Sequence, residues 1–139
     1  MSAVIDHIRT VPLFRGMPAF ALETVADRAS ETTFSDGETV TREGEPGETF
    51  YIVTEGRLRV SQHGALIREL GPGDFLGEIS LVDGRPRTAT VTAVGTVQAL
   101  VIRRADFLEM IEFDSAVRLG ILMALTERIR TADTGDMLD

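Results

Sequence analysis

The run from Phe75 to Val91 reads FLGEISLVDGRPRTATV, and it breaks a regular alternation of short strands and turns. Its spacing predicts a strand that ends at Leu76, followed by a helix of one or two turns over Gly77–Val82. The pair Asp83-Gly84 ends this helix, and a new strand is predicted from Arg87 on. This run decides the fold because it requires a short helix inserted between two strands.

Further strands are predicted on both sides of this run, between Glu31 and Arg103. Short segments rich in β-branched and aromatic residues alternate there with turns that contain Gly, Pro or Asp. The alternation of Leu58 and Val60 indicates a strand with one buried face. Many short strands at this spacing predict a β-sandwich or a β-barrel. The predicted strands are Thr32–Phe34, Glu38–Thr41, Thr49–Thr54, Arg57–Ser61, Leu66–Leu70, Arg87–Ala93 and Val97–Ile102, with Glu55-Gly56 and Val94-Gly95-Thr96 among the turns.

Helices are predicted at both ends of the chain, where apolar residues recur at helical spacing. Asp114 or Ser115 is the natural N-cap of the last helix. Residues 119–125 within that helix are apolar almost all round, which is typical of a helix buried on more than one side. The predicted helices are Ala3–Ile8, Pro18–Ala29, Ala105–Phe113 and Ser115–Arg130.

The composition excludes several classes of function. The chain has 139 residues, which suits one domain, and no cysteine, which excludes disulfides, thiolate catalysis and Cys-based metal sites. Its two histidines, His7 and His63, are far apart in the sequence, so no metal site is expected. A net charge of -8 disfavours non-specific binding to nucleic acid, because contacts to phosphates dominate that affinity.

The motifs that are absent from the sequence bear on its location in the cell and on catalysis. No run of about 18 apolar residues is present, and the polar amino terminus does not resemble a signal peptide, so a cytoplasmic location is predicted. No G-x-S-x-G motif surrounds Ser80, and no pair of carboxylates lies in an apolar pattern. The sequence therefore predicts a protein that is not an enzyme.

The run from residue 77 to 91 contains the groups that an anion site needs in an acidic protein. The start of a short helix offers backbone N–H groups without an intrahelical acceptor, and Gly77 lets a ligand approach the backbone closely. Arg87 supplies a planar set of donors that can bind two phosphate oxygens at once. Glu78, when ionised, accepts a hydrogen bond from a hydroxyl group, and Thr88 adds a hydroxyl beside the arginine. Together these residues predict a site for a small phosphorylated sugar.

The same run resembles the phosphate-binding cassette of cyclic nucleotide-binding domains. The resemblance lies in Gly77–Leu81, a four-residue spacer, and then Pro86–Val91. It extends over nearly the whole chain, because other segments resemble the strands and turns of the roll in that family. These segments are Gly37-Glu38, Glu45–Val53, Glu55-Gly56 and Gly71–Phe75.

The resemblance implies an α+β fold in a single domain over residues 1–139. The expected core is an antiparallel β-roll, similar to a double-stranded β-helix or jelly roll. N-terminal helices precede it over residues 1–30, the roll covers 31–103 with the cassette at 75–91, and two C-terminal helices follow over 104–132.

The resemblance also implies a ligand, cAMP or alternatively cGMP, that is bound reversibly and without a further cofactor. Arg87 would contact the cyclic phosphate, and Glu78 would accept from the ribose 2′-OH. Thr88 would contact either the phosphate or a purine, which keeps cGMP open. The backbone at Gly77, Ile79, Ser80 and Ala89 would line the phosphate and sugar, and the last helix would cover the base with Leu122, Leu125, Thr126, Ile129 or Arg130.

Several alternatives remain open at this stage. Arg87 and Glu78 are also able to form a structural ion pair, in a module that keeps the fold and binds no nucleotide. A second alternative is the sensing half of a larger transcription regulator, and the chain is either a stand-alone sensor or a piece of a longer protein. No helix-turn-helix follows the last helix, so direct DNA binding is not expected.

The expected partners, beyond the nucleotide, are an unknown protein or a fused effector domain. A homodimer through Ser115–Arg130 is also plausible. One face of that helix would carry Val117, Ile121, Ala124 and Arg128, with Gly120 allowing close approach.

Overall fold

The computed structural model describes residues 2–133 and divides the chain into two compact units. The larger unit runs from Asp27 to Leu108 and contains all the strands. The other unit combines the residues up to Ala26 with those from Glu109 on.

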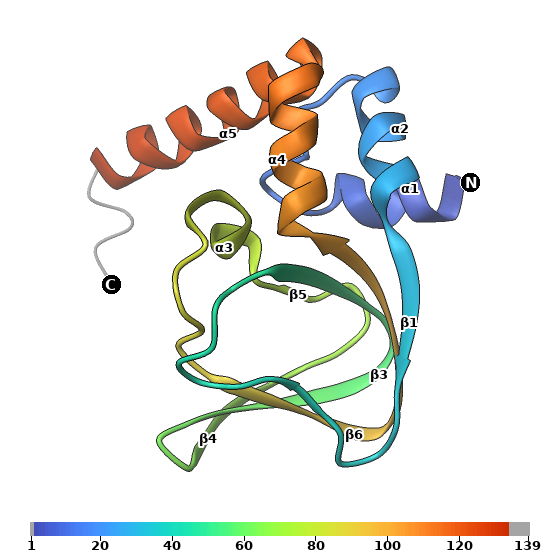
Figure 1. Cartoon of the computed structure of the whole chain (residues 1–139), viewed down its shortest axis with the longest axis vertical. Helices are drawn as coiled ribbons and strands as arrows, with labels where there is room; N and C mark the ends of the chain where they lie inside the picture. The colour runs from blue at the N-terminus through green and yellow to red at the C-terminus, as the bar shows by residue number, and fades with distance from the viewer. Residues whose placement is uncertain (1, 134–139) are drawn as a thin grey trace. The chain divides into compact units, whose positions relative to one another are not determined.

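The larger unit is an antiparallel β-roll of six strands. β3 (Thr49–Gln62) and β6 (Thr90–Arg103) run side by side along it, as Figure 1 shows. The strand order is β1-β6-β3-β4, while β2 pairs with β6 and β5 pairs with β3. The predicted α+β fold with an antiparallel roll is therefore confirmed. The shorter elements of this unit are β1 (Ser30–Phe34), β2 (Thr39–Thr41), β4 (Ala65–Leu70), β5 (Phe75–Leu76) and α3 (Glu78–Asp83).

The two long strands differ from the sequence prediction, which divides each of them into two. β3 continues through Glu55-Gly56 and β6 continues through Val94-Gly95-Thr96, so the prediction of turns at these positions is wrong. The register between β3 and β6 shifts here without ending the pairing. Gly56 has a φ of 92°, and a Cβ on it would lie 2.5 Å from the carbonyl oxygen of Thr96. Glycine therefore permits a bulge at a close approach of two strands, where the sequence alone suggests a turn.

β6 also begins later than predicted, at Thr90 instead of Arg87. The reason lies in the backbone of Arg87, which bonds to the loop before β3 rather than to a neighbouring strand. Its N–H donates to the carbonyl of Glu45 at 2.7 Å, and its carbonyl accepts from the N–H of Gly44 at 2.9 Å. The segment before Thr90 is thus held by this loop.

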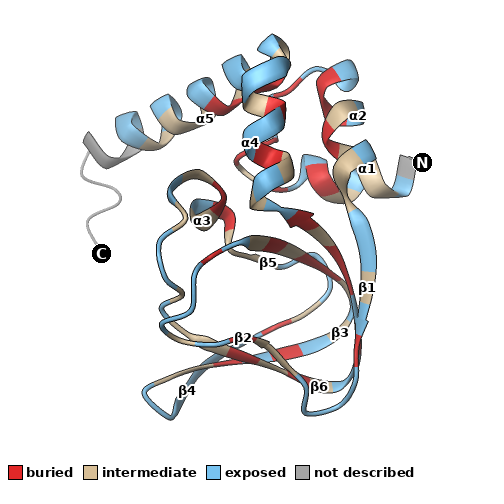
Figure 2. Ribbon diagram, viewed as in Figure 1, coloured by how far each residue is buried: buried red, intermediate tan, exposed pale blue. Residues whose placement is uncertain are grey.

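The core of the roll is formed largely by buried residues of β3 and β6, and Figure 2 shows stretches of both ribbons in the red that marks buried residues. Phe34 closes part of this core by packing edge-on against Tyr51, with 5.7 Å between the ring centroids. The buried members of the cluster are Phe34, Val53, Leu58, Val60, Leu70, Val91, Ala93, Val97 and Ala99.

The second unit is helical. Asp114 caps its last helix, because Oδ1 accepts from the N–H groups of Ala116 and Val117, each at 3.0 Å. Asp114 rather than Ser115 is therefore the N-cap. The helices that lie wholly or partly in this unit are α1 (Ser2–Arg9), α2 (Ala19–Arg28), α4 (Arg104–Phe113) and α5 (Ser115–Asp133).

The face of α5 that was expected to form a homodimer is partly buried within this unit. Val117 and Ile121 are buried, and a Cβ on Gly120 would lie 2.7 Å from the side chain of Met17. Gly120 therefore allows Met17 to approach α5, whereas Ala124 and Arg128 of the same face are only half-buried, and a homodimer through this helix stays a prediction. The large apolar side chains that α5 leaves exposed are Leu119, Leu122, Met123 and Ile129.

Candidate functional site

A cavity of about 480 Å³ opens on the roll beside α3. The residues predicted to bind the ligand all line it, namely Gly77, Glu78, Ile79, Ser80, Arg87, Thr88 and Ala89. They come from two segments, which are the start of α3 and the coil that leads into β6. The structure therefore brings both halves of the predicted site to one cavity. The other lining residues are Thr41, Val60, Arg68, Leu70, Phe75, Leu76, Asp83, Arg85, Pro86 and Val91.

Two glycines with left-handed backbone enclose α3. Gly77 precedes the helix with a φ of 89°, and Gly84 follows it with a φ of 65° and donates its N–H to the carbonyl of Ser80 at 2.8 Å. Glycine adopts positive φ without the steric cost of a Cβ atom. In the first turn, the N–H groups of Ile79 and Ser80 have no acceptor within the helix, and both residues line the cavity.

Arg87 is fixed in the wall of the cavity by Thr49. Its Nη2 donates to the carbonyl oxygen of Thr49 at 2.5 Å and to the hydroxyl oxygen at 2.8 Å. Burial lowers the pKa of Arg87 from its ordinary value, and electrostatic interactions with Tyr51 and Glu48 oppose this change. An arginine side chain stays protonated at neutral pH in proteins. The cavity therefore contains a partly buried positive charge in a fixed orientation.

Gly77 and Gly47 let the segments around the cavity approach one another. A Cβ on Gly77 would lie 2.6 Å from Nη1 of Arg87 and 2.7 Å from the carbonyl oxygen of Thr49. A Cβ on Gly47 would lie 2.6 Å from the side chain of Ser80. Glycine at 77 is thus required both by its positive φ and by its closeness to the arginine. The sequence alone does not assign Gly47 and Thr49 to the site, because only the folded chain brings them to the cassette.

Glu78 is the first residue of α3, and it is only 7% exposed. The dipole of a helix favours a negative charge in the first turn. An ionised Glu78 offers oxygen acceptors on the same cavity as the donors of Arg87. The pair suits a ligand that carries both a hydroxyl group and an anionic group.

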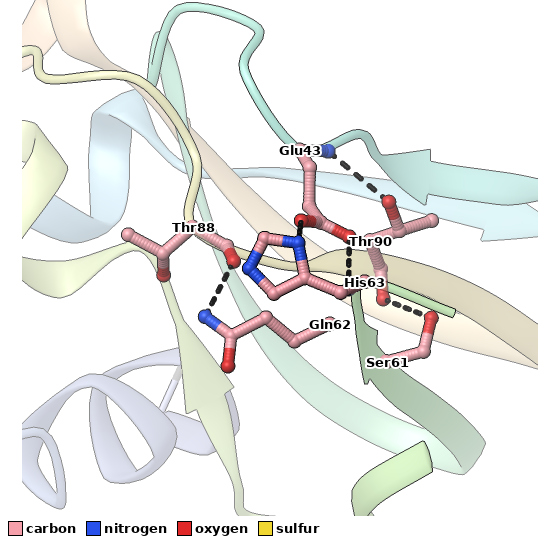
Figure 3. A network of polar contacts seen from close by, with 6 residues as sticks. All are labelled: Glu43, Ser61, Gln62, His63, Thr88 and Thr90. Carbon is pink, nitrogen blue, oxygen red and sulfur yellow. Dashed lines mark hydrogen bonds and ion pairs between the residues drawn. The ribbon is translucent and has the colours of Figure 1, made fainter. Parts of the chain in front are cut away.

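The segment from Arg87 to Thr90 is tied to the roll through the carbonyl groups of its four residues. The carbonyl of Thr88 accepts from Nε2 of Gln62 at 2.9 Å, and that of Thr90 accepts from the hydroxyl of Ser61 at 3.4 Å (Figure 3). The N–H of Glu43 donates to the hydroxyl of Thr90 at 3.1 Å. The carbonyls of Arg87 and Ala89 accept from Gly44 and Thr41, so the segment is bound at successive residues.

One row of paired strand residues lies along the cavity. Thr41 pairs with Val91, Val91 pairs with Val60, and Val60 pairs with Arg68, and all four line the cavity. The first three are buried, whereas Arg68 on β4 is exposed. The sequence pattern indicates the buried face of Val60 but not the rest of the row, because the row depends on pairing registers between distant strands.

The residues expected to cover the base lie on α5, in the other unit. None of the five is among the residues that line this cavity, and Leu125 lines a second cavity of about 440 Å³ within its own unit. Their role as a lid stays a prediction. The residues concerned are Leu122, Leu125, Thr126, Ile129 and Arg130.

Among residues 2–133, no three His, Cys, Asp or Glu side chains are grouped so that they could hold a metal ion. In the same part of the chain, no helix combines the length and the apolar character needed to cross a bilayer.

Comparison with known proteins gives consistent matches. A family model described as "Cyclic nucleotide-binding domain" matches residues 31–114. A cAMP-dependent protein kinase regulatory subunit of Dictyostelium discoideum is 34% identical over an alignment of 110 residues that covers 73% of this chain and 34% of that protein. A cyclic nucleotide-gated potassium channel of Mesorhizobium japonicum is 38% identical over 100 residues, or 72% of this chain and 28% of that protein. The chain thus spans about a third or less of the length of these relatives.

Solved structures agree in fold. The N-terminal domain of a transcriptional regulator from Streptomyces coelicolor has a TM-score of 0.84 and 30% identity, with 96% of each chain covered. A cyclic nucleotide-binding-like protein from Brucella abortus has a TM-score of 0.73 and 27% identity, covering 79% of this chain and 98% of its own.

Proposed function

Since this chain belongs to the cyclic nucleotide-binding domain family, we propose that it is a sensor that binds cAMP, or alternatively cGMP, reversibly and without chemical turnover. The observation that carries the proposal is the meeting of Arg87, Glu78 and the first turn of α3 on one cavity. A guanidinium and backbone N–H groups suit a cyclic phosphate, while a carboxylate suits a ribose hydroxyl. A cytoplasmic location is part of the proposal.

In this sensor, the ligand acts on the segments that line the cavity. Arg87 binds two oxygens of the phosphate, Glu78 accepts from the 2′-OH, and the backbone of Gly77, Ile79, Ser80 and Ala89 contacts the phosphate and sugar. α5 then covers the base through Leu122, Leu125, Thr126, Ile129 or Arg130 and relays binding to a partner protein or a fused domain. The ligand shifts this equilibrium only by as much as its affinities for the two states differ.

One relative favours a specific alternative for the partner. The Streptomyces structure is the N-terminal domain of a transcriptional regulator, and it matches this chain along nearly its whole length. The chain is then the sensing part of a regulator, with the same ligand and the same cavity. A module that keeps the fold without binding a nucleotide is the alternative that the experiment must exclude.

Isothermal titration calorimetry with cAMP and with cGMP tests the function. We expect saturable binding of at least one nucleotide and a loss of about 100-fold or more in affinity for Arg87→Ala, because a charged partner of the phosphate is removed. Arg59→Ala is the matched control, because Arg59 is an exposed arginine of β3 that does not line the cavity. Incubation of cAMP with the protein should release no AMP. Absence of heat with both nucleotides contradicts the sensor and favours the nucleotide-independent module.

A further inference from the structure

Gln62 lies at the end of β3, outside the lining of the cavity, and its side chain reaches the segment that carries the anion-binding groups. Its Nε2 donates to the carbonyl of Thr88 at 2.9 Å, as Figure 3 shows. The hairpin turn that follows Gln62 is itself anchored, because the N–H of His63 donates to the carboxylate of Glu43 at 2.9 Å. The amide of Gln62 therefore reaches Thr88 from a strand end that the hydrogen bond between His63 and Glu43 holds in place.

This hydrogen bond also sets the direction of the next amide group. In a planar trans peptide, the C=O and the following N–H point in opposite directions. The carbonyl of Thr88 points toward Gln62, so the N–H of Ala89 points away from Gln62. Thr88 and Ala89 line the cavity, whereas Gln62 does not. The N–H of Ala89 therefore points to the side of the coil opposite Gln62, and Ala89 itself lines the cavity.

The N–H of Ala89 is available for a ligand. It finds no acceptor among residues 2–133, although Ala89 is only partly exposed. The carbonyl of the same residue accepts from the hydroxyl of Thr41 at 3.4 Å. A backbone N–H is a strong donor, and without a partner in the protein it can donate to an oxygen of a ligand. Its position two residues after Arg87 suits an oxygen of the phosphate that Arg87 binds.

We propose that Gln62 is a positioning residue that aims the N–H of Ala89 at one exocyclic oxygen of the bound cyclic phosphate, an inference that rests on the proposed function. A glutamine amide is suited to this role, because it is a neutral donor long enough to cross from β3 to the coil. A carboxylate at the same place would present an acceptor to the carbonyl of Thr88, so this hydrogen bond would not form and the carbonyl would not be held in its direction.

The test compares the wild-type chain with Gln62→Met, which keeps the length of the side chain and removes the donor. Affinities are measured for the nucleotide that binds and for its two phosphorothioate diastereomers, each of which replaces one exocyclic oxygen by sulfur, a weaker acceptor. We expect Gln62→Met to weaken the parent nucleotide about five- to tenfold. We call the loss of affinity on replacing one exocyclic oxygen by sulfur the sulfur penalty. In Gln62→Met, this penalty should shrink toward onefold for one diastereomer only, because the oxygen replaced in that diastereomer has already lost its oriented donor.

Three controls separate positioning from a structural role. Gln98→Met removes an exposed glutamine side chain of β6 that does not line the cavity, and it should leave all affinities unchanged. Gln62→Lys restores a donor and should recover most of the affinity. The unfolding midpoint of Gln62→Met without ligand should match the wild type.

Two results overturn the inference while the proposed function stands. One is wild-type affinity of Gln62→Met for the parent nucleotide. The other is a weaker affinity with both sulfur penalties unchanged, since Gln62 then does not act through one phosphate oxygen. If the wild-type chain binds no cyclic nucleotide at all, the proposed function itself fails.

Discussion

Nη2 of Arg87 donates at the same time to the carbonyl and hydroxyl oxygens of Thr49, at 2.5 and 2.8 Å. Thr49 is the first residue of β3, so the guanidinium is held by one of the two long strands of the roll. The other nitrogens of this guanidinium form no hydrogen bond within residues 2–133. They remain as donors for a ligand, and the contact with Thr49 fixes the direction in which they point.

Thr49→Val should weaken nucleotide binding about three- to tenfold, because it removes one of the two acceptors that orient Arg87 and keeps the shape of the side chain. The unfolding midpoint should change little, since valine is favoured in strands. Calorimetric titration and thermal unfolding measure the two effects. An increase in affinity would show instead that Thr49 competes with the ligand for the guanidinium.

Gly77→Ala should destabilise the protein and weaken binding together. A Cβ at this position meets Nη1 of Arg87 at 2.6 Å and the carbonyl of Thr49 at 2.7 Å, in addition to the positive φ of 89°. Gly73→Ala is the matched control, because Gly73 has a φ of 91° and no atom within 4 Å of its Cβ position. The control should lose only about 1–2 kcal/mol of unfolding free energy, which is the cost of a Cβ atom at positive φ.

Thermal unfolding and nucleotide titration of both glycine variants measure this difference. Gly77→Ala should lose more stability than the control and most of its affinity, while the control should bind as the wild type does. Equal losses of stability with unchanged binding in both variants would contradict the steric role assigned to Gly77.

The parts of the cavity wall that the sequence predicts are local. α3 and the coil with Arg87 belong to one run of 17 residues from Phe75 to Val91, in which Gly77, Gly84 and the spacing of apolar residues mark the helix ends. Their meeting on one cavity follows from the shortness of the chain between them.

The parts that the sequence does not predict depend on contacts between distant segments. Thr49 approaches Arg87 across 38 residues, and Gln62 approaches Thr88 across 26 residues. The same holds for the long strands, where Gly56 marks a bulge because β6 lies close to it, and for Gly120, which faces Met17. At Gly56 and Gly120, the absence of a Cβ atom leaves room for a neighbouring segment, and only the fold shows which segment fills it.

Asp114→Ala should destabilise the protein by about 1 kcal/mol at neutral pH, because it removes the N-cap of α5. The N–H of Val117 holds the pKa of Asp114 below its ordinary value of 3.8, burial opposes this, and Thr24, Ala116 and Arg118 add to the lowering. Since the pKa is lower in the folded state, the stabilisation is present above about pH 4 and is lost as pH falls through the folded pKa.

Urea unfolding of the wild type, Asp114→Ala and Asp114→Asn at a series of pH values checks this prediction. The difference between wild type and the alanine variant should stay constant down to about pH 4 and decrease below it. Asp114→Asn keeps a good cap without a titrating charge, so its difference from the alanine variant should not change with pH. A constant difference between wild type and alanine at all pH values would contradict the lowered pKa.

Arg68→Ala should weaken cGMP more than cAMP. Arg68 ends the row of paired residues along the cavity, next to Val60, and its side chain forms no ion pair or hydrogen bond within residues 2–133. Guanine presents two adjacent acceptors, O6 and N7, to such a guanidinium, whereas adenine presents a donor beside N7. We expect a loss of about tenfold for cGMP and of less than about threefold for cAMP.

Parallel titrations of both nucleotides against Arg68→Ala and Arg59→Ala measure this preference. Arg59 is an exposed arginine of the adjacent strand β3 and does not line the cavity, so its removal changes the net charge in the same way without changing the site. A loss that is equal for the two nucleotides would show that Arg68 acts only through its charge on the phosphate. A larger loss for cGMP that the Arg59 variant does not share assigns to Arg68 a contact with the base.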